Sequence, residues 1–119
     1  MASEVPSESD DERWLVIKGR RWRRTDPALP DDVAVRLRSH LGRARSAVRG
    51  AMSADDEAAV RRARQRVGLA KTGLGERGAR WWETDVAARL AQARSCLAEL
   101  DRIAPPDAAR ADPASGVNA

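Results

Sequence analysis

The chain is poor in the residues on which common catalytic and metal sites depend. Its 119 residues include no Phe or Tyr, one cysteine (Cys96) and one histidine (His40). A single cysteine cannot form an internal disulfide, and a single histidine without a cysteine cluster is a poor basis for a metal site or a Ser-His-Asp triad. We therefore predict no cofactor, no metal and no enzymatic activity. His40 is expected to flank an apolar helix face, and Cys96 to be a small packing residue.

The chain also lacks long apolar runs. None approaches the roughly 18 to 20 residues that a membrane helix needs, and nothing in the acidic amino terminus resembles a signal peptide. The composition, with 42% hydrophobic and 34% charged residues, is typical of a soluble protein, and we predict a cytoplasmic location without a transmembrane segment. Because much of the apolar content is alanine, the four tryptophans are expected to supply a large share of the energy of burial.

Charge and periodicity divide the chain into three parts. Residues 1–12 contain five acidic residues and no basic ones, and residues 105–119 are rich in Pro and Ala without periodicity, so both ends are predicted to be disordered. The single predicted domain spans residues 13–104. Residues 13–80 contain 18 basic and 7 acidic residues, a net charge of +11 within a chain of net charge +4. This asymmetry favours a polyanionic partner, for which the acidic end could compete.

Residues 13–24, RWLVIKGRRWRR, predict a β-hairpin, because β-branched and aromatic residues flank a glycine. The turn is either residues 18–19 or residues 19–20, and both registers place Leu15, Ile17 and Trp22 on one face. An isolated hairpin is marginal in water, so this face is expected to dock on the helices. The opposite face carries Trp14, Val16, Arg21 and Arg23.

Three helices are predicted from apolar residues at alternating spacings of three and four. The first begins after Pro30 and breaks at residues 50–53, the second has Ser53 as its cap, and the third begins at Thr84 and ends before Pro105. The seam of the first helix consists of Leu37, Leu41, Ala44, Val48 and Ala51. The seam of the second consists of Val60, Ala63, Val67, Ala70 and Leu74. The seam of the third consists of Val86, Leu90, Ala93, Leu97 and Leu100.

Two matched, alanine-rich seams joined by a short connection predict that the first two helices form an antiparallel hairpin. The predicted fold is therefore mainly α: an antiparallel helical hairpin plus a third helix, with a short N-terminal β-hairpin. A coiled-coil oligomer is an alternative use of the same seams. Packing within one chain is favoured because the connections are short, and we expect a monomer or a weak homodimer.

The stretch KTGLGERGARWW, residues 71–82, interrupts the helical pattern. Its glycines match G-x-G-x-x-G, but no strand precedes them, so the stretch predicts a helix stop and a rigid corner rather than a dinucleotide site. Trp81 and Trp82 are expected to hold the third helix and the β-hairpin against the helical pair. The alternative is a loop that contacts phosphate or a partner through Lys71, Arg77, Arg80 and Trp82. The acids nearest to this loop are Glu76, Glu83 and Asp85, the only ones that warrant a test for chemistry.

Basic residues surround the tryptophans of the predicted β-hairpin, a composition typical of nucleic-acid contact surfaces. Arginines there can reach phosphates, and an exposed indole can stack on a base. Alternatively, the arginines solvate a hairpin edge and the tryptophans belong to the core. The predicted nucleic-acid-binding residues are Lys18, Arg20, Arg21, Arg23, Arg24 and Trp14.

Two segments, GRRWRRTDPALP (19–30) and KTGLGERGARWWE (71–83), together with the arginines on the helices, resemble a group of short bacterial proteins of unknown function. Some of these are labelled "biopolymer transporter Tol". The resemblance covers about residues 13–83 and implies no catalytic residues. Tol transport components have a membrane helix or a β-propeller, neither of which this sequence predicts.

These features favour a small, non-enzymatic helical protein that binds nucleic acid or another polyanion through an arginine-rich hairpin. The alternative is an interaction or scaffold module whose hairpin and tryptophan loop dock on a protein partner or on a second copy of the chain.

Overall fold

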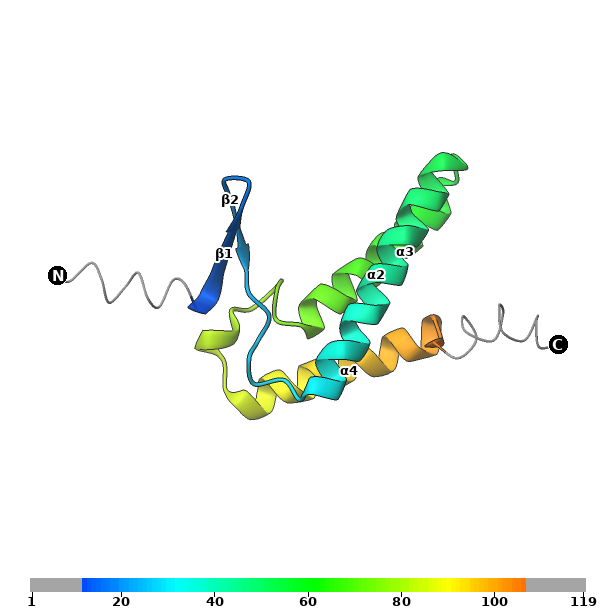
Figure 1. Cartoon of the computed structure of the whole chain (residues 1–119). Helices are drawn as coiled ribbons and strands as arrows, with labels where there is room; N and C mark the ends of the chain where they lie inside the picture. Colours follow the sequence, from blue (N-terminus) through cyan, green and yellow to red (C-terminus); the bar gives the residue numbers. More distant parts are fainter. Residues whose placement is uncertain (1–11, 107–119) are drawn as a thin grey trace.

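The computed structural model describes residues 12–106, which form a β-hairpin followed by three helices (Figure 1). The elements are β1 (Trp14–Ile17), β2 (Arg20–Arg23), α2 (Asp31–Ser53), α3 (Glu57–Gly73), the 3₁₀ turn η1 (Trp81–Glu83) and α4 (Val86–Ile103). The predicted fold class, mainly helical with an N-terminal β-hairpin, is confirmed. The ends predicted to be disordered, 1–12 and 105–119, lie outside the described residues except for Glu12, Pro105 and Pro106.

The β-hairpin turns at Lys18 and Gly19, both of which have positive φ angles (53° and 80°). Two such residues in succession suit the right-handed twist of paired strands. Leu15 therefore pairs with Trp22 and Ile17 with Arg20, which selects the first of the two predicted registers and confirms the apolar face.

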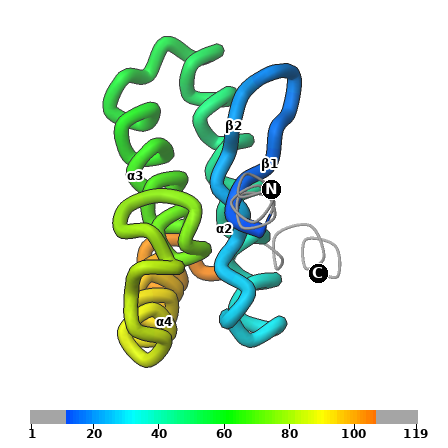
Figure 2. The backbone as a smooth tube through the Cα atoms, turned by 90° about the vertical axis from the view of Figure 1, so that its left-hand side faces the viewer, coloured from blue at the N-terminus to red at the C-terminus, as the bar shows by residue number. Residues whose placement is uncertain are grey.

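The apolar face of the hairpin docks less closely than expected. The hairpin projects from the helices (Figures 1 and 2), and Ile17 and Trp22 are 51% and 38% exposed. The hairpin is held instead by its opposite face, where Trp14 meets the edge of Trp82 at 5.7 Å between ring centroids. The alternative interpretation, in which the tryptophans belong to the core, is therefore wrong for Trp22.

Helices α2 and α3 form the predicted antiparallel pair. Their buried residues include Leu37, Leu41 and Ala44 of α2 and Ala63 and Ala70 of α3. The predicted break at residues 50–53 is wrong, because α2 runs through Gly50 to Ser53. A single glycine costs a helix only about 1 kcal/mol relative to alanine. The turn follows at Asp55, whose φ is 56°. The cap of α3 is Asp56, whose carboxylate accepts a hydrogen bond from the Ala59 amide at 3.0 Å, and not Ser53.

Helix α4 lies across the beginning of α2 and the end of α3 (Figures 1 and 2), so the three seams meet within one chain as predicted. The predicted seam residue Val86 is an exception, because it lies at the start of α4 and is 47% exposed. The cap of α4 is Asp85, which accepts from the Ala88 amide, rather than the predicted Thr84. Cys96 is buried, and burial raises the pKa of its thiol, as befits a packing residue. The central cluster consists of Leu29, Val33, Ala34, Leu37, Leu41, Ala70, Leu74, Ala93, Leu97 and Leu100.

His40 is buried, with 1% of its surface exposed, and does not merely flank the seam. Its Nε2 lies 2.7 Å from Asp101 Oδ1 on α4, and its Nδ1 lies 3.0 Å from Arg43 Nη2. A carboxylate only accepts and a guanidinium only donates, so the ring is neutral with its proton on Nε2. Arg36 also pairs with Asp101. At this joint between α2 and α4, one ring nitrogen of His40 therefore contacts Asp101 of α4 and the other contacts Arg43 of α2.

This joint makes stability sensitive to pH. Burial is the main cause that lowers the pKa of His40, helped by the charges of Arg43 and Arg66 and opposed by Asp101. The unfolded chain, with an imidazole pKa of about 6.5, then takes up a proton before the folded chain does, so protonation favours unfolding. We expect the urea midpoint to fall as pH decreases from about 7 to 5, and to fall less in His40→Gln. An equal pH slope in both proteins would contradict this expectation.

Within residues 12–106, no helix combines the length and apolar character needed to cross a membrane.

Candidate nucleic-acid interface

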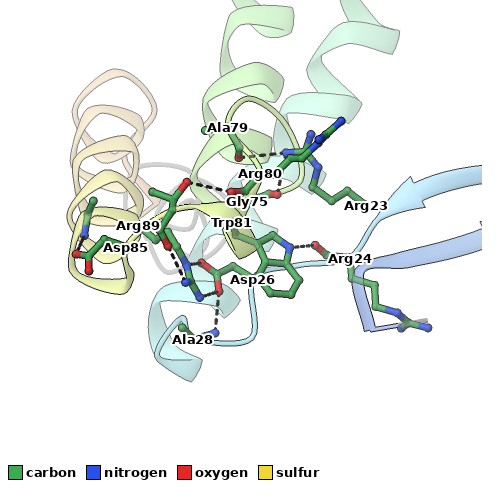
Figure 3. A network of polar contacts seen from close by, with 12 residues as sticks. Arg23, Arg24, Asp26, Ala28, Gly75, Ala79, Arg80, Trp81, Asp85 and Arg89 are labelled. Carbon is green, nitrogen blue, oxygen red and sulfur yellow. Dashed lines mark hydrogen bonds and ion pairs between the residues drawn. The ribbon is translucent and has the colours of Figure 1, made fainter. Parts of the chain in front are cut away.

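A buried ion pair between Asp26 and Arg89 fixes the corner from which the β-hairpin projects (Figure 3). Arg89 Nε and Nη2 donate to the two carboxylate oxygens of Asp26, each at 2.8 Å. Asp26 is 3% exposed, and its backbone amide donates to the Leu74 carbonyl at 2.9 Å. Asp26 thus joins the segment after the hairpin to the start of α4 through its carboxylate and to the end of α3 through its backbone amide.

The glycine stretch packs directly on this ion pair. Gly75 has a φ of +79°, and a Cβ added there would lie 2.9 Å from the Asp26 Cβ, so only glycine fits. Trp81 is buried beside it, and its indole Nε1 donates to the Arg24 carbonyl at 3.0 Å (Figure 3). The predicted helix stop and corner are confirmed, and the two distinctive sequence segments meet here.

Arg23 and Trp14, two residues predicted to bind nucleic acid, instead make contacts within this corner. Arg23 Nη1 donates to the carbonyls of Gly78 at 2.9 Å and of Ala79 at 3.3 Å (Figure 3). Trp14 is half-buried, with the Arg21 guanidinium 4.2 Å from its ring centroid and Trp82 at its edge. Both side chains therefore stabilise the junction between hairpin and loop, a role that the alternation of the strand alone did not predict.

A hollow of about 320 Å³ lies between the β-hairpin and the helical pair; we call it the hairpin hollow. Its lining combines the apolar face of the hairpin with charged side chains from α2, α3 and the glycine loop. These residues include Leu15, Ile17, Trp22, Arg45, Lys71 and Glu76. Arg23 lines the hollow as well. An indole beside three cations in one hollow is a surface suited to a planar, anionic ligand.

A second hollow, of about 460 Å³, continues along α2 and α3; we call it the arginine hollow. Arg45 lines both hollows, which are therefore neighbours, and we call the two together the basic groove. Arg77 reaches over α3, since a Cβ added at Gly68 would lie 3.5 Å from its Nη1. The arginine hollow is lined by Arg45, Val48, Arg49, Arg64, Val67 and Arg77.

Within the part of the chain that the structure describes, basic side chains outnumber acidic ones in the lining of the basic groove. Among residues 12–106, no carboxylate lies within ion-pairing distance of Arg45, Arg49, Arg64 or Arg77. Burial lowers the pKa of Lys71; Glu76 raises it and the charges of Arg45 and Arg77 lower it further. Glu76, the acid in the hairpin hollow, accepts a hydrogen bond from Thr25 Oγ1 at 2.6 Å. An anion that entered the groove would thus contact several cations that lie close together before it binds.

The predicted site residues divide between this groove and other surfaces. Lys71, Arg77 and Arg23 line it, and Arg20 lies at its edge, with its guanidinium 4.7 Å from the Trp22 ring centroid. Lys18 is exposed at the hairpin tip, and Arg24 Nε donates to the Trp14 carbonyl at 3.2 Å. Arg80 lies 3.4 Å from Glu83, and Trp82 packs under Arg13 and Arg23. The hairpin and loop candidates therefore do not form one patch.

Sequence reasoning did not select Trp22, Arg45, Arg49 and Arg64 as binding residues. A signal was present, because arginines at 45 and 49 are four apart, and Arg64 and Lys71 are seven apart, so each pair shares a helix face. That these two faces meet beside Trp22 depends on how α2 and α3 pair. The ion pair between Asp26 and Arg89 was not predicted either, because a Thr-Asp-Pro segment predicts a turn and the start of a helix.

Within residues 12–106, no group of three His, Cys, Asp or Glu side chains is placed to hold a metal ion. No protein-family model, curated protein or solved structure matches the chain. The resemblance of the two segments to short bacterial proteins therefore stays a prediction, and the case for a function depends on the geometry of the groove.

Proposed function

We propose that this protein is a non-enzymatic nucleic-acid-binding protein whose contact surface is the basic groove. The observation that supports this most is the gathering of Arg45, Arg49, Arg64, Lys71 and Arg77 from two helices and a loop beside an exposed tryptophan. A phosphate backbone is a row of negative charges with bound counterions, and neutralising it by arginine releases those counterions. Helices α2 and α3 fix the backbone positions of Arg45, Arg49, Arg64 and Lys71, so binding has to order only their side chains.

Relative to the sequence-based hypothesis, the proposed surface moves from the β-hairpin arginines to the groove behind them. Arg23 is engaged with the loop carbonyls, whereas Arg20 remains at the groove edge. The hairpin then contributes one wall of the site rather than the whole of it. The proposed location is the cytoplasm, where nucleic acid is abundant.

The test is the salt dependence of binding to labelled DNA and RNA. For the wild-type chain, log K is expected to fall linearly with log salt, by about 0.7 to 0.9 for each phosphate neutralised. The variant Arg45→Gln/Arg64→Gln/Arg77→Gln should flatten this slope by about 2 to 3 and lower the affinity at about 50 mM salt by at least roughly tenfold.

The matched control is Arg62→Gln/Arg94→Gln/Arg102→Gln, which removes the same charge at exposed positions that do not line the groove. Its slope should stay within about 1 of the wild-type value. Equal losses in both triple variants would mean that net charge alone drives binding. Absence of binding at low salt would refute the proposed function.

The second candidate is the protein-interaction module, and one observation favours it. Ile17 and Trp22 on one face of the projecting hairpin are 51% and 38% exposed, and Val16 on the other face is 68% exposed. Exposed apolar surface of this kind often marks a protein interface. A stable dimer in light scattering that dissociates in Ile17→Asp, together with absence of nucleic-acid binding, would favour this function over the first.

A further inference from the structure

We infer that the basic groove binds single-stranded rather than duplex nucleic acid, with one unstacked base lying on the indole of Trp22. This inference depends on the proposed function and adds to it the form of the nucleic acid and the residue that reads it. The argument comes from the exposure of Trp22, the cations around its ring and the hollow that it lines.

Trp22 is an exposed aromatic side chain with no structural role comparable to that of the other tryptophans. It is 38% exposed, whereas Trp81 is buried and donates to the Arg24 carbonyl. Trp14, the residue that the sequence favoured for stacking, lies between Arg21 and the edge of Trp82. A base can therefore reach the indole of Trp22 more readily than that of Trp14.

The cations next to Trp22 are long side chains that a phosphate can attract. The Arg20 guanidinium lies 4.7 Å and the Lys71 Nζ 5.2 Å from the Trp22 ring centroid. A charge-assisted bond to phosphate is stronger than a cation–π contact at an exposed site. On binding, Arg20 and Lys71 would turn toward the phosphates that flank a base, and the ring face would become free for that base.

The hairpin hollow suits one base and its neighbouring phosphates. Leu15 and Ile17 form its apolar wall next to Trp22, and Arg45 leads into the arginine hollow. With a base stacked on Trp22, the next phosphates of the bound nucleic-acid strand would thus lie beside Arg45, Arg49 and Arg64. In a duplex each base is stacked between its neighbours and offers no free face, so Trp22 can contribute only to binding of an unpaired strand.

The experiment compares one labelled oligonucleotide, single-stranded and paired with its complement, on the full chain and on Trp22→Leu and Trp22→Phe. Stacking on an aromatic ring changes affinity by about 5- to 150-fold per base. We expect Trp22→Leu to weaken single-strand binding by that factor and duplex binding by less than about twofold, and Trp22→Phe to retain most of the single-strand affinity. Because Trp22 is partly exposed, thermal melting should show both variants to be folded.

Unchanged single-strand affinity in Trp22→Leu, or tighter binding of the duplex by the wild-type chain, would overturn the inference and leave the proposed function standing. Failure to bind either form at low salt would overturn both. Equal and large losses for single strand and duplex in Trp22→Leu would assign Trp22 to the shape of the groove instead of to a base.

Discussion

Replacing Asp26 with alanine is expected to lower the free energy of unfolding by about 3 to 5 kcal/mol, the usual cost of leaving one member of a buried ion pair without its partner. Arg89 would keep its positive charge in a site where its side chain is only 13% exposed. The Ala28 amide would lose its acceptor as well. Because a small domain has only about 5 to 15 kcal/mol of stability, the variant should unfold tens of degrees earlier than the wild-type chain in a thermal melt.

A double-mutant cycle isolates the ion pair. Asp26→Ala/Arg89→Met removes both charges and should recover part of the loss, because a buried apolar pair is often tolerated where a lone charge is not. The matched control is Glu83→Ala, which breaks the Arg80–Glu83 pair on the surface, where both side chains are more than half exposed. Such pairs contribute less than about 1 kcal/mol. Similar effects of Asp26→Ala and Glu83→Ala would show that Asp26 does not organise the corner.

Trp81→Ala is expected to cost about 3 to 5 kcal/mol, the range for removal of a large buried aromatic side chain. Trp81 is 9% exposed, lies edge-on to Trp82 at 5.2 Å, and donates to the Arg24 carbonyl. Its loss would open a cavity beside Gly75 and Asp26 and separate the hairpin from α4. Chemical denaturation monitored by circular dichroism measures the change without depending on tryptophan fluorescence.

Trp82→Ala provides the comparison for Trp81. Trp82 is half-buried and contacts Trp14 and the guanidinium groups of Arg13 and Arg23, so its removal should lower the melting temperature less than removal of Trp81 and should loosen mainly the hairpin. If Trp82→Ala left stability unchanged while abolishing nucleic-acid binding, the loop would be a recognition surface, and the basic groove would not be the whole site.

The structure also explains why the β-hairpin residues predicted to bind nucleic acid differ from the residues that line the basic groove. Strand alternation correctly separates Leu15, Ile17 and Trp22 from Trp14 and Val16, but it does not say which face is covered. Trp14 is covered because η1 brings Trp82 to it, and Trp22 stays exposed because α2 and α3 present Arg45 and Lys71 across a hollow. Exposure thus depends on partners that lie from 23 positions (Trp22 and Arg45) to 68 positions (Trp14 and Trp82) apart in the sequence.

The sequence by itself determined the three helices, the β-hairpin and the corner, because these follow from periodicity, turn residues and glycines over a few residues. The ends of the helices were predicted less accurately, since Gly50 lies within α2 and Asp56, not Ser53, caps α3. Only the tertiary structure decided that Asp26 pairs with Arg89, that His40 pairs with Asp101, and that Trp22 shares a hollow with a cation from each of α2 and α3. These contacts join residues up to 63 positions apart, and their geometry depends on how whole helices pack, which no local pattern encodes.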